Sequence, residues 1–238
     1  MHPMSALPKL TRRQLWTLIT LTLVWGINWP IMKFGVTGFP PLTFRSLSML
    51  TGLPVLALAL VLMKVPFRIP RTHWWELLKL AFFNLFVWHV LVILALPMLS
   101  SGRAAILGYT MPIFSAIWGV FWFNAPLRAR QWLGVAAAGV GVLLLLWNEL
   151  NHLSGQPFWV VMVLIAAAVW AYGTQRLRHT PMDVPTLTIA FWMTSLTTVL
   201  LTVLACVFEQ DRWYMPAPST QWAILYNALG VFAFAQAA

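Results

Sequence analysis

Long runs of apolar residues, separated by short polar or turn-forming segments, extend along almost the whole chain. Each run holds roughly 20 residues, enough for an α-helix to cross a hydrocarbon core about 30 Å thick. Because lipid offers the backbone no hydrogen-bond partners, each run is predicted to be a helix, and the fold class an all-α, polytopic transmembrane helical bundle. The predicted spans cover 14–34, 41–63, 76–98, 103–123, 130–147, 157–174 and 186–208, and an eighth run, 221–238, ends with the chain.

The composition favours the same class of protein. Hydrophobic residues make up 61% of the 238 residues and charged residues only 8%, whereas about a quarter of a soluble domain is charged. The formal net charge of +10 would suggest a nucleic-acid partner for a soluble protein. Here the charges lie between the apolar runs, so they are interpreted as determinants of membrane orientation, with the lipid bilayer and not nucleic acid as the partner.

Basic residues recur in alternate connections between the predicted spans. Eleven of them fall on one side of the predicted membrane, around the N-terminus and the second–third, fourth–fifth and sixth–seventh connections. The other side holds Arg103 and Arg212, together with acidic residues. The positive-inside rule therefore predicts a multi-pass protein of the inner cell membrane with a cytoplasmic N-terminus.

Matches in the same order along the chain indicate an internal repeat. Leu23–Asn28 in the first span resembles Ala168–Gly173 in the sixth, at an offset of 145 residues, and a proline follows in both copies where the next helix starts. Trp75 and its neighbours align with Trp222 and its neighbours at an offset of 147 residues. A unit of five helices is odd in number, so the second copy enters the membrane in the opposite orientation, as in many secondary transporters.

The repeat also predicts how much of the fold the chain holds. The first five-helix unit is placed at 14–147 and the second, incomplete, at 157–238. By extrapolation from the first unit, the second lacks roughly 56 residues, so the chain is expected to hold about 7.5 of ten helices.

Several short motifs follow one another in a recognisable order and spacing. They are Trp25-Gly26-Ile27-Asn28-Trp29 with Lys33, Pro40-Pro41 with Arg45, Ser101–Ala105, Tyr109–Phe114, Gly134–Gly141 and Trp170-Ala171-Tyr172. In these motifs, which together cover nearly the whole chain, the sequence resembles the EamA-type branch of the drug/metabolite transporter superfamily.

The resemblance implies ten helices in two inverted five-helix halves, with both termini in the cytoplasm. It also implies a central cavity and alternating-access transport, often export, of small organic metabolites or drugs, without a cofactor. The early stop departs from the family, because a member without its last helices would lack part of the cavity wall. An inactive truncated fragment, and a membrane-embedded enzyme or scaffold, are therefore kept as alternatives.

Six polar or aromatic residues are predicted to line the substrate cavity. Asn28 and His89 are polar groups deep in apolar spans, where they are costly unless they face protein or a cavity, and hydrogen bonding between helices is the alternative for both. Aromatic rings can stack on planar or cationic solutes, although most of the tryptophans are expected at interfaces or in packing. The six candidates are Trp25, Asn28, His89, Tyr109, Trp170 and Tyr172.

Charged residues near helix ends receive a structural interpretation. Lys33, Arg45 and Arg103 are expected to extend toward the membrane surface or to pair with other groups. Gly134 and Gly141, with Ala138, lie on one face of the fifth span. Such small faces permit close helix contact, which favours packing within the chain over a homodimer but leaves both open.

Motifs of several enzyme classes are absent from the sequence. It holds no Gly-rich phosphate loop, no His-Glu-x-x-His zinc motif and no Gly-x-Ser-x-Gly element. The single cysteine, Cys206, allows neither an internal disulfide nor a cysteine zinc cluster. The sequence therefore predicts neither an enzyme nor a metal site.

Overall fold

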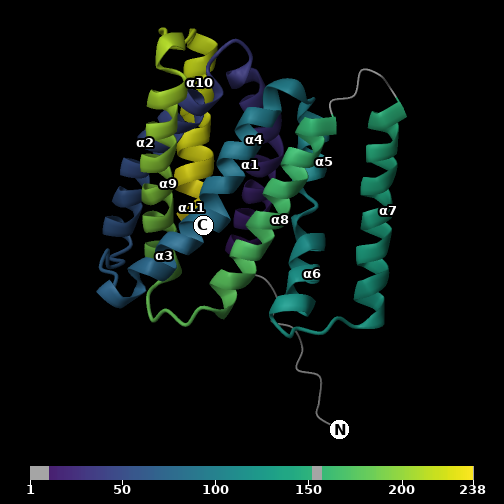
Figure 1. Cartoon of the computed structure of the whole chain (residues 1–238). Helices are drawn as coiled ribbons and strands as arrows, with labels where there is room; N and C mark the ends of the chain where they lie inside the picture. The colour runs from purple at the N-terminus through teal and green to yellow at the C-terminus, as the bar shows by residue number, and fades with distance from the viewer. Residues whose placement is uncertain (1–10, 152–156, 238) are drawn as a thin grey trace.

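The computed structural model describes residues 11–151 and 157–237, and helices joined by short connections make up this part of the chain, without strands. Six of its helices are long and apolar enough to cross a membrane, and Ala129–Leu144 forms a shorter apolar one. The predicted all-α transmembrane bundle is confirmed for the described residues (Figure 1).

Each predicted span coincides with a helix or a stack of helical segments. Four are unbroken: α1 (Arg12–Val36), α2 (Pro41–Leu62), α8 (Pro157–His179) and α9 (Thr186–Phe208). A fifth, α7, covers Ala129–Asn151.

The remaining three spans are segmented. The third consists of η1 (Arg71–His73), α3 (Trp74–Leu80), η2 (Ala81–Phe86), α4 (Val87–Ala95) and η3 (Leu96–Met98). The fourth consists of α5 (Ser101–Gly108) and α6 (Met111–Trp122). The last consists of α10 (Pro218–Tyr226), η5 (Asn227–Phe234) and α11 (Ala235–Ala237), and the short η4 (Gln210–Arg212) precedes it.

Local sequence explains where several helices begin. Prolines occupy the first turns of α2 and α10, where a missing N–H leaves no hydrogen bond unmade. Thr11 and Gln14 form a reciprocal capping box at the start of α1, and the side chain of Ser100 caps α5. The side-chain oxygens of Thr11, Gln14 and Ser100 accept from backbone N–H groups that would otherwise lack partners in lipid.

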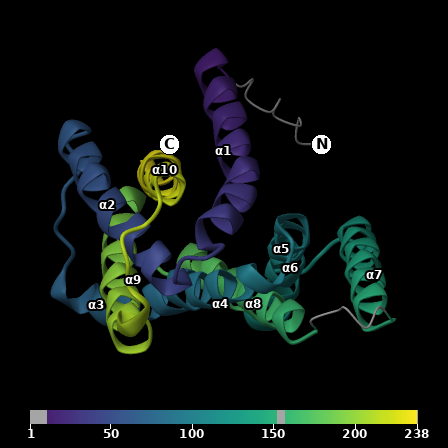
Figure 2. The ribbon, with the colours of Figure 1, turned by 90° about the horizontal axis from the view of Figure 1, so that it is seen from above.

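The antiparallel pair of α2 and α9 lies at one end of the bundle and is joined at both of its own ends (Figures 1 and 2). The buried carboxylate of Glu209, just past α9, accepts hydrogen bonds from the backbone N–H groups of Leu42 and Thr43 at 3.1 and 2.7 Å. It thereby caps the N-terminus of α2, where the helix dipole favours a negative charge.

Side chains from the start of α9 join the opposite end of the same pair. The hydroxyl of Thr188 donates to the carbonyl of Pro66 at 2.6 Å, and the indole N–H of Trp192 donates to that of Phe67 at 2.7 Å. The chain that follows α2 is therefore held against α9, and relative movement of the two helices must strain one set of contacts or the other.

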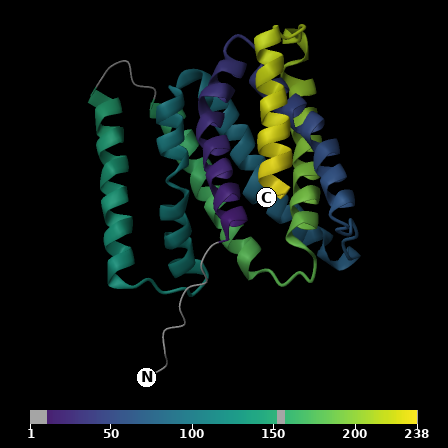
Figure 3. The same cartoon turned by 180° about the vertical axis from the view of Figure 1, so that it is seen from behind.

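Viewed from above, α1, α10 and α2 lie along one side of the molecule, while α3, α4 and α8 form the other (Figure 2). The α5–α6 span packs against α8. Helix α7 stands apart from the rest, as the view from behind also shows (Figure 3). In the described part of the chain no atom lies within 4 Å of a Cβ built at Gly134 or Gly141, so packing of this face within the chain and packing in a homodimer both stay predictions.

Close contacts between spans occur at other glycines, among them Gly52, Gly108 and Gly173. A Cβ built at Gly52 would lie 2.8 Å from the carbonyl oxygen of Ala228, and one at Gly108 would lie 2.7 Å from the ring of Trp29. At Gly173 of α8 the Cβ would lie 2.6 Å from the backbone nitrogen of Asn84 in η2, a closer approach to backbone than at Gly52. These contacts bring together the second and eighth, the first and fourth, and the third and sixth spans.

The bounds of the helices follow the offsets seen in the sequence. Helices α8 and α9 begin 145 residues after α1 and α2. Both η2 and η5 are π-helical, and η2 shifted by 147 residues falls at 228–233, inside η5. Helix α1 runs away from the end of the bundle marked by the N-terminus and α8 runs toward it (Figure 1). These registers are those expected of an inverted five-helix repeat.

The contact at Gly173 predicts a strong effect of one methyl group. Gly173→Ala should lower the free energy of unfolding by about 1–3 kcal/mol, because the methyl group would force α8 away from η2. Gly26→Ala is the matched control: no atom lies within 4 Å of its Cβ position, and alanine favours a helix over glycine. Thermal unfolding of both purified variants in detergent measures the difference, and equal midpoints would contradict this packing.

Candidate functional site

A cavity of about 250 Å³ lies where elements of five spans meet. Its wall is mainly aromatic and aliphatic, with few polar groups. Its lining residues include Trp25 from α1, Trp88 and His89 from α4, Trp170 from α8, Ala190 and Met193 from α9, and Phe232 from η5. A mostly apolar pocket with a few converging polar groups is typical of a small-molecule site.

A smaller cavity of about 20 Å³ adjoins the first. The two share the lining residues Trp25, Trp88, His89 and Val231. The small cavity is further lined by polar and sulfur-containing side chains, which are Asn28, Trp29, Met32 and Arg45. We call it the side chamber; its volume is about that of one water molecule.

Arg45 lies buried at the wall of the side chamber, and only 2% of its surface is exposed. Its Nη1 donates to Oδ1 of Asn227 at 3.3 Å, and Nη2 lies against the sulfur of Met32. The guanidinium carbon is 5.4 Å from the ring centre of Phe232. Of the two roles expected for Arg45, extension to the membrane surface or pairing with other groups, the structure shows no extension to the surface, because α1 and η5 enclose its side chain.

Unpartnered polar atoms gather around the side chamber. The described residues contain seven buried side-chain nitrogen or oxygen atoms without a hydrogen-bond partner. Four of the seven belong to lining residues of this chamber: Oδ1 of Asn28, Nε1 of Trp29, Nε of Arg45 and Nδ1 of His89. Native proteins leave few such atoms, so a cluster of four suggests the position of a polar ligand or water.

Four of the six predicted cavity residues line a cavity. Trp25 and His89 line both, Asn28 lines the side chamber, and Trp170 lines the larger cavity. His89 packs edge-on against Phe232, with ring centres 5.4 Å apart. Whether these residues contact a substrate stays a prediction.

The other two predicted cavity residues lie elsewhere. Tyr172 follows Trp170 by two positions, a rotation of about 200° around a helix, so its ring packs against Phe83 and Trp118 instead. Tyr109, 51% exposed, lies in the turn between α5 and α6 and contacts the outer side of Trp29. Neither tyrosine lines the two cavities described above.

Lys33 contacts the end of the third span. Its ammonium group donates to the carbonyls of Leu96 and Pro97 at 3.1 and 2.7 Å. It therefore satisfies carbonyl groups at the end of the third span, where the helix dipole also favours a positive charge. Arg103 lies half-buried in the first turn of α5.

Sequence reasoning missed several cavity residues. Asn84 carried the same signal as Asn28, a polar amide in an apolar span, and its side chain donates to Thr174 at 2.8 Å and to the carbonyl of Trp170 at 3.3 Å. Phe232 and Val231 lie in the last described span and gave no local signal. Their place in the wall follows from the packing of η5 against α2.

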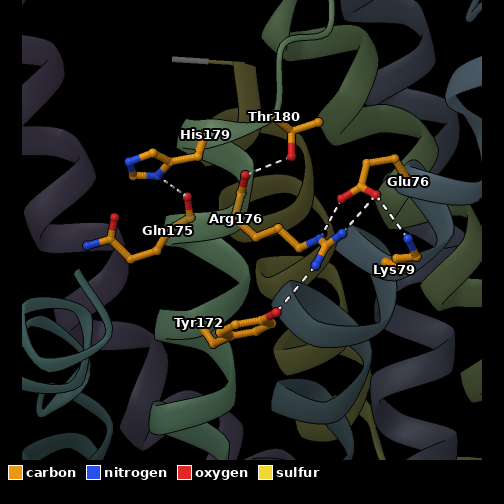
Figure 4. A network of polar contacts seen from close by, with 7 residues as sticks. All are labelled: Glu76, Lys79, Tyr172, Gln175, Arg176, His179 and Thr180. Atoms are coloured by element: carbon orange, nitrogen blue, oxygen red, sulfur yellow. Dashed lines mark hydrogen bonds and ion pairs between the residues drawn. The ribbon is translucent and has the colours of Figure 1, made fainter. Parts of the chain in front are cut away.

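A separate polar network joins α3 to the last turns of α8 (Figure 4). The carboxylate of Glu76 accepts two hydrogen bonds from the guanidinium of Arg176 and one from Lys79, whose nitrogen is 3.2 Å away. Arg176 also donates to the hydroxyl of Tyr172 at 3.3 Å. This network therefore connects the third and sixth spans at the basic side of the bundle.

These features define a polytopic helical membrane protein with an enclosed apolar cavity, the architecture of a small-solute transporter. The model of the EamA-like transporter family matches residues 13–147. The chain therefore belongs to this family, within the drug/metabolite transporter superfamily, and is a multi-pass membrane transporter.

Individual relatives are similar over most of the chain. "Uncharacterized transporter YoaV" of Bacillus subtilis is 25% identical, over 89% of this chain and 73% of its own length. "Uncharacterized inner membrane transporter YedA" of Escherichia coli K12 is 26% identical, over 89% and 68%. "Probable amino-acid metabolite efflux pump" of Escherichia coli K12 is 27% identical, over 65% and 50%.

A solved structure shares the fold. This crystal structure superimposes with a TM-score of 0.63 at 21% sequence identity, and the match covers 93% of this chain and 76% of the other. At this identity the similarity concerns the fold alone.

The network around Glu76 predicts rescue by charge reversal. Glu76→Arg and Arg176→Glu should each lower the thermal unfolding midpoint, and the double variant should recover most of the loss. The side chains are 21% and 27% exposed, so each single change should cost only about 1 kcal/mol. Arg178→Glu, an exposed neighbour, is the control; a double variant no more stable than the single ones would contradict the pairing.

Proposed function

We propose that this transporter is a secondary carrier that exports small organic metabolites or drugs by alternating access. In this proposal the two inverted repeats, 14–147 and 157–238, rock against each other around the cavity. The observation that carries it is the composition of the cavity wall, which draws Trp25 and Trp88 from the first repeat and Trp170 and Phe232 from the second. A site shared by two repeats changes its exposure when they move.

Contacts between the repeats at both ends of the bundle support the proposal. At the basic side, Arg176 of the second repeat pairs with Glu76 of the first. At the other side, Glu209 of the second repeat accepts from Leu42 and Thr43 of the first. Both contacts are polar, and switching transitions commonly repack polar contacts at an interface.

The proposed direction and orientation have separate support. A relative named as an efflux pump for amino-acid metabolites favours export of small organic solutes. The clustering of basic residues in alternate connections favours a cytoplasmic N-terminus in the inner membrane. The alternative of a membrane-embedded enzyme gains no support from relatives that are named as transporters.

Flux through the purified chain tests the proposal. Proteoliposomes that contain it should exchange at least one radiolabelled compound from a panel of hydrophobic amino acids, their organic acids and cationic dyes. Ala190→Trp should reduce this flux at least about tenfold, because Ala190 lines the cavity and the indole would fill much of its volume.

The matched control is Ala136→Trp, on the exposed surface of α7, which should retain the flux. Absence of flux for the whole panel, or equal flux in the two tryptophan variants, would contradict the proposal.

A further inference from the structure

Within residues 11–151 and 157–237, the charge of Arg45 has no opposite charge beside it. Arginine stays protonated in proteins, and Arg45 is almost completely buried. In the described part of the chain no carboxylate lies within ion-pair distance of its guanidinium, whose neighbours are Asn227, Met32 and Phe232. A buried ion without a counterion costs several kcal/mol, so the fold retains this cation at a disadvantage.

The neighbours of Arg45 satisfy its donors only weakly. A thioether sulfur is a poor acceptor, yet the sulfur of Met32 faces Nη2 of Arg45 and also receives the amide of Asn28 at 3.4 Å. Nε of Arg45 has no partner, and neither does the indole N–H of Trp29 beside the same chamber. The chamber thus presents donor groups and a positive charge, and the acceptor oxygens beside it, Oδ1 of Asn28 and of Asn227, are uncharged.

We propose that the side chamber is an anion subsite in which Arg45 binds the carboxylate of the transported solute. In this arrangement the carboxylate takes the place of the Met32 sulfur against the guanidinium. Trp29 supplies a further N–H donor, and the rest of the solute lies in the larger cavity. This inference deepens the proposed function, on which it rests, by naming the chemical class of its substrate.

The dimensions and charges favour a carboxylate over a more highly charged group. Among the residues that line the two cavities, Arg45 alone carries a permanent charge, so it balances one negative charge and not the greater charge of a phosphate. A planar guanidinium also matches the two oxygens of a carboxylate. The side chamber of about 20 Å³ is small, which suits a compact group once Met32 moves aside.

The larger cavity defines the rest of the solute. Its wall combines the rings of Trp25, Trp88 and Trp170 with aliphatic side chains. At about 250 Å³ it has room for one aromatic ring or a branched aliphatic group. The substrate class is therefore a small organic acid with an apolar body and a single carboxylate.

A matched pair of probes tests the subsite without requiring transport. Binding of 3-phenylpropionate and of its neutral amide, 3-phenylpropionamide, is measured by equilibrium dialysis with the whole chain in lipid nanodiscs. The native chain should bind the carboxylate at least about tenfold more tightly than the amide, because only the carboxylate pairs with the cation. Arg45→Gln should bind both probes equally, with the affinity for the amide unchanged.

Arg68→Gln is the control for net charge. Arg68 is exposed and lies outside both cavities, so this variant should keep the preference of the native chain. A preference that persists in Arg45→Gln, or a native chain that binds neither probe or binds both equally, would overturn the subsite. Binding with the expected preference but without flux in proteoliposomes would overturn the proposed function and leave the subsite standing.

Stability distinguishes a ligand-binding arginine from a structural one. Arg45→Gln and Arg45→Met remove a buried cation that has no counterion, so both should unfold at the same temperature as the native chain or higher. If either variant unfolds several degrees lower, Arg45 serves the fold, and the subsite is wrong.

Discussion

Every backbone polar group that a helix end or break exposes inside the bilayer must find its partner within the protein, because lipid offers none. Several interior polar side chains bond the backbone of another span. Glu209 accepts from the start of α2, Lys33 donates to the end of the third span, and Gln175 donates to the carbonyl of Ser115 within α6 at 2.7 Å. In each case a side chain from one span satisfies the backbone of another, so the same bonds that cap the helices also join the spans.

Arg45 is the exception to this rule, and the exception coincides with the cavity. The polar groups named above have strong partners, whereas Arg45, Trp29, Asn28 and His89 leave buried atoms without any. Aromatic side chains enclose these atoms, so the site is mainly apolar and yet holds a buried cation with no carboxylate beside it in the described chain. A solute with an acceptor group and an apolar body would pair with the cation and fill the apolar cavity at once. The packing of the cavity wall and the proposed function are connected in this way.

Much of the fold could be predicted from the sequence because membrane spans depend on length and hydropathy alone. A break such as the one in the third span could not be predicted from the sequence: Ala81–Phe86 contains no proline or glycine, yet it forms a π-helix against α8. The candidate site was predicted in part. Trp25, Asn28, His89 and Trp170 are inward-facing, but alignment of the repeats gave the position of Tyr172 and not the side of the helix it occupies.

Two other expectations left alternatives open for one reason. Arg45 was expected to reach the surface or to pair with other groups, and the face with Gly134 to pack within the chain or in a homodimer. In both cases the outcome depends on whether a distant segment covers the residue. Helices α1 and η5 cover Arg45, and nothing in the described chain covers Gly134. The predicted further helices and the homodimer stay predictions.

The central claim is that one cavity faces each side of the membrane in turn, and site-directed labelling measures this most directly. On a Cys206→Ser background, Ala190→Cys places the only thiol in the cavity wall. A membrane-impermeant maleimide is then applied to right-side-out and inside-out vesicles. The account predicts labelling from both sides, slowed in both by a solute that binds. Labelling from one side only, or from neither, would contradict it.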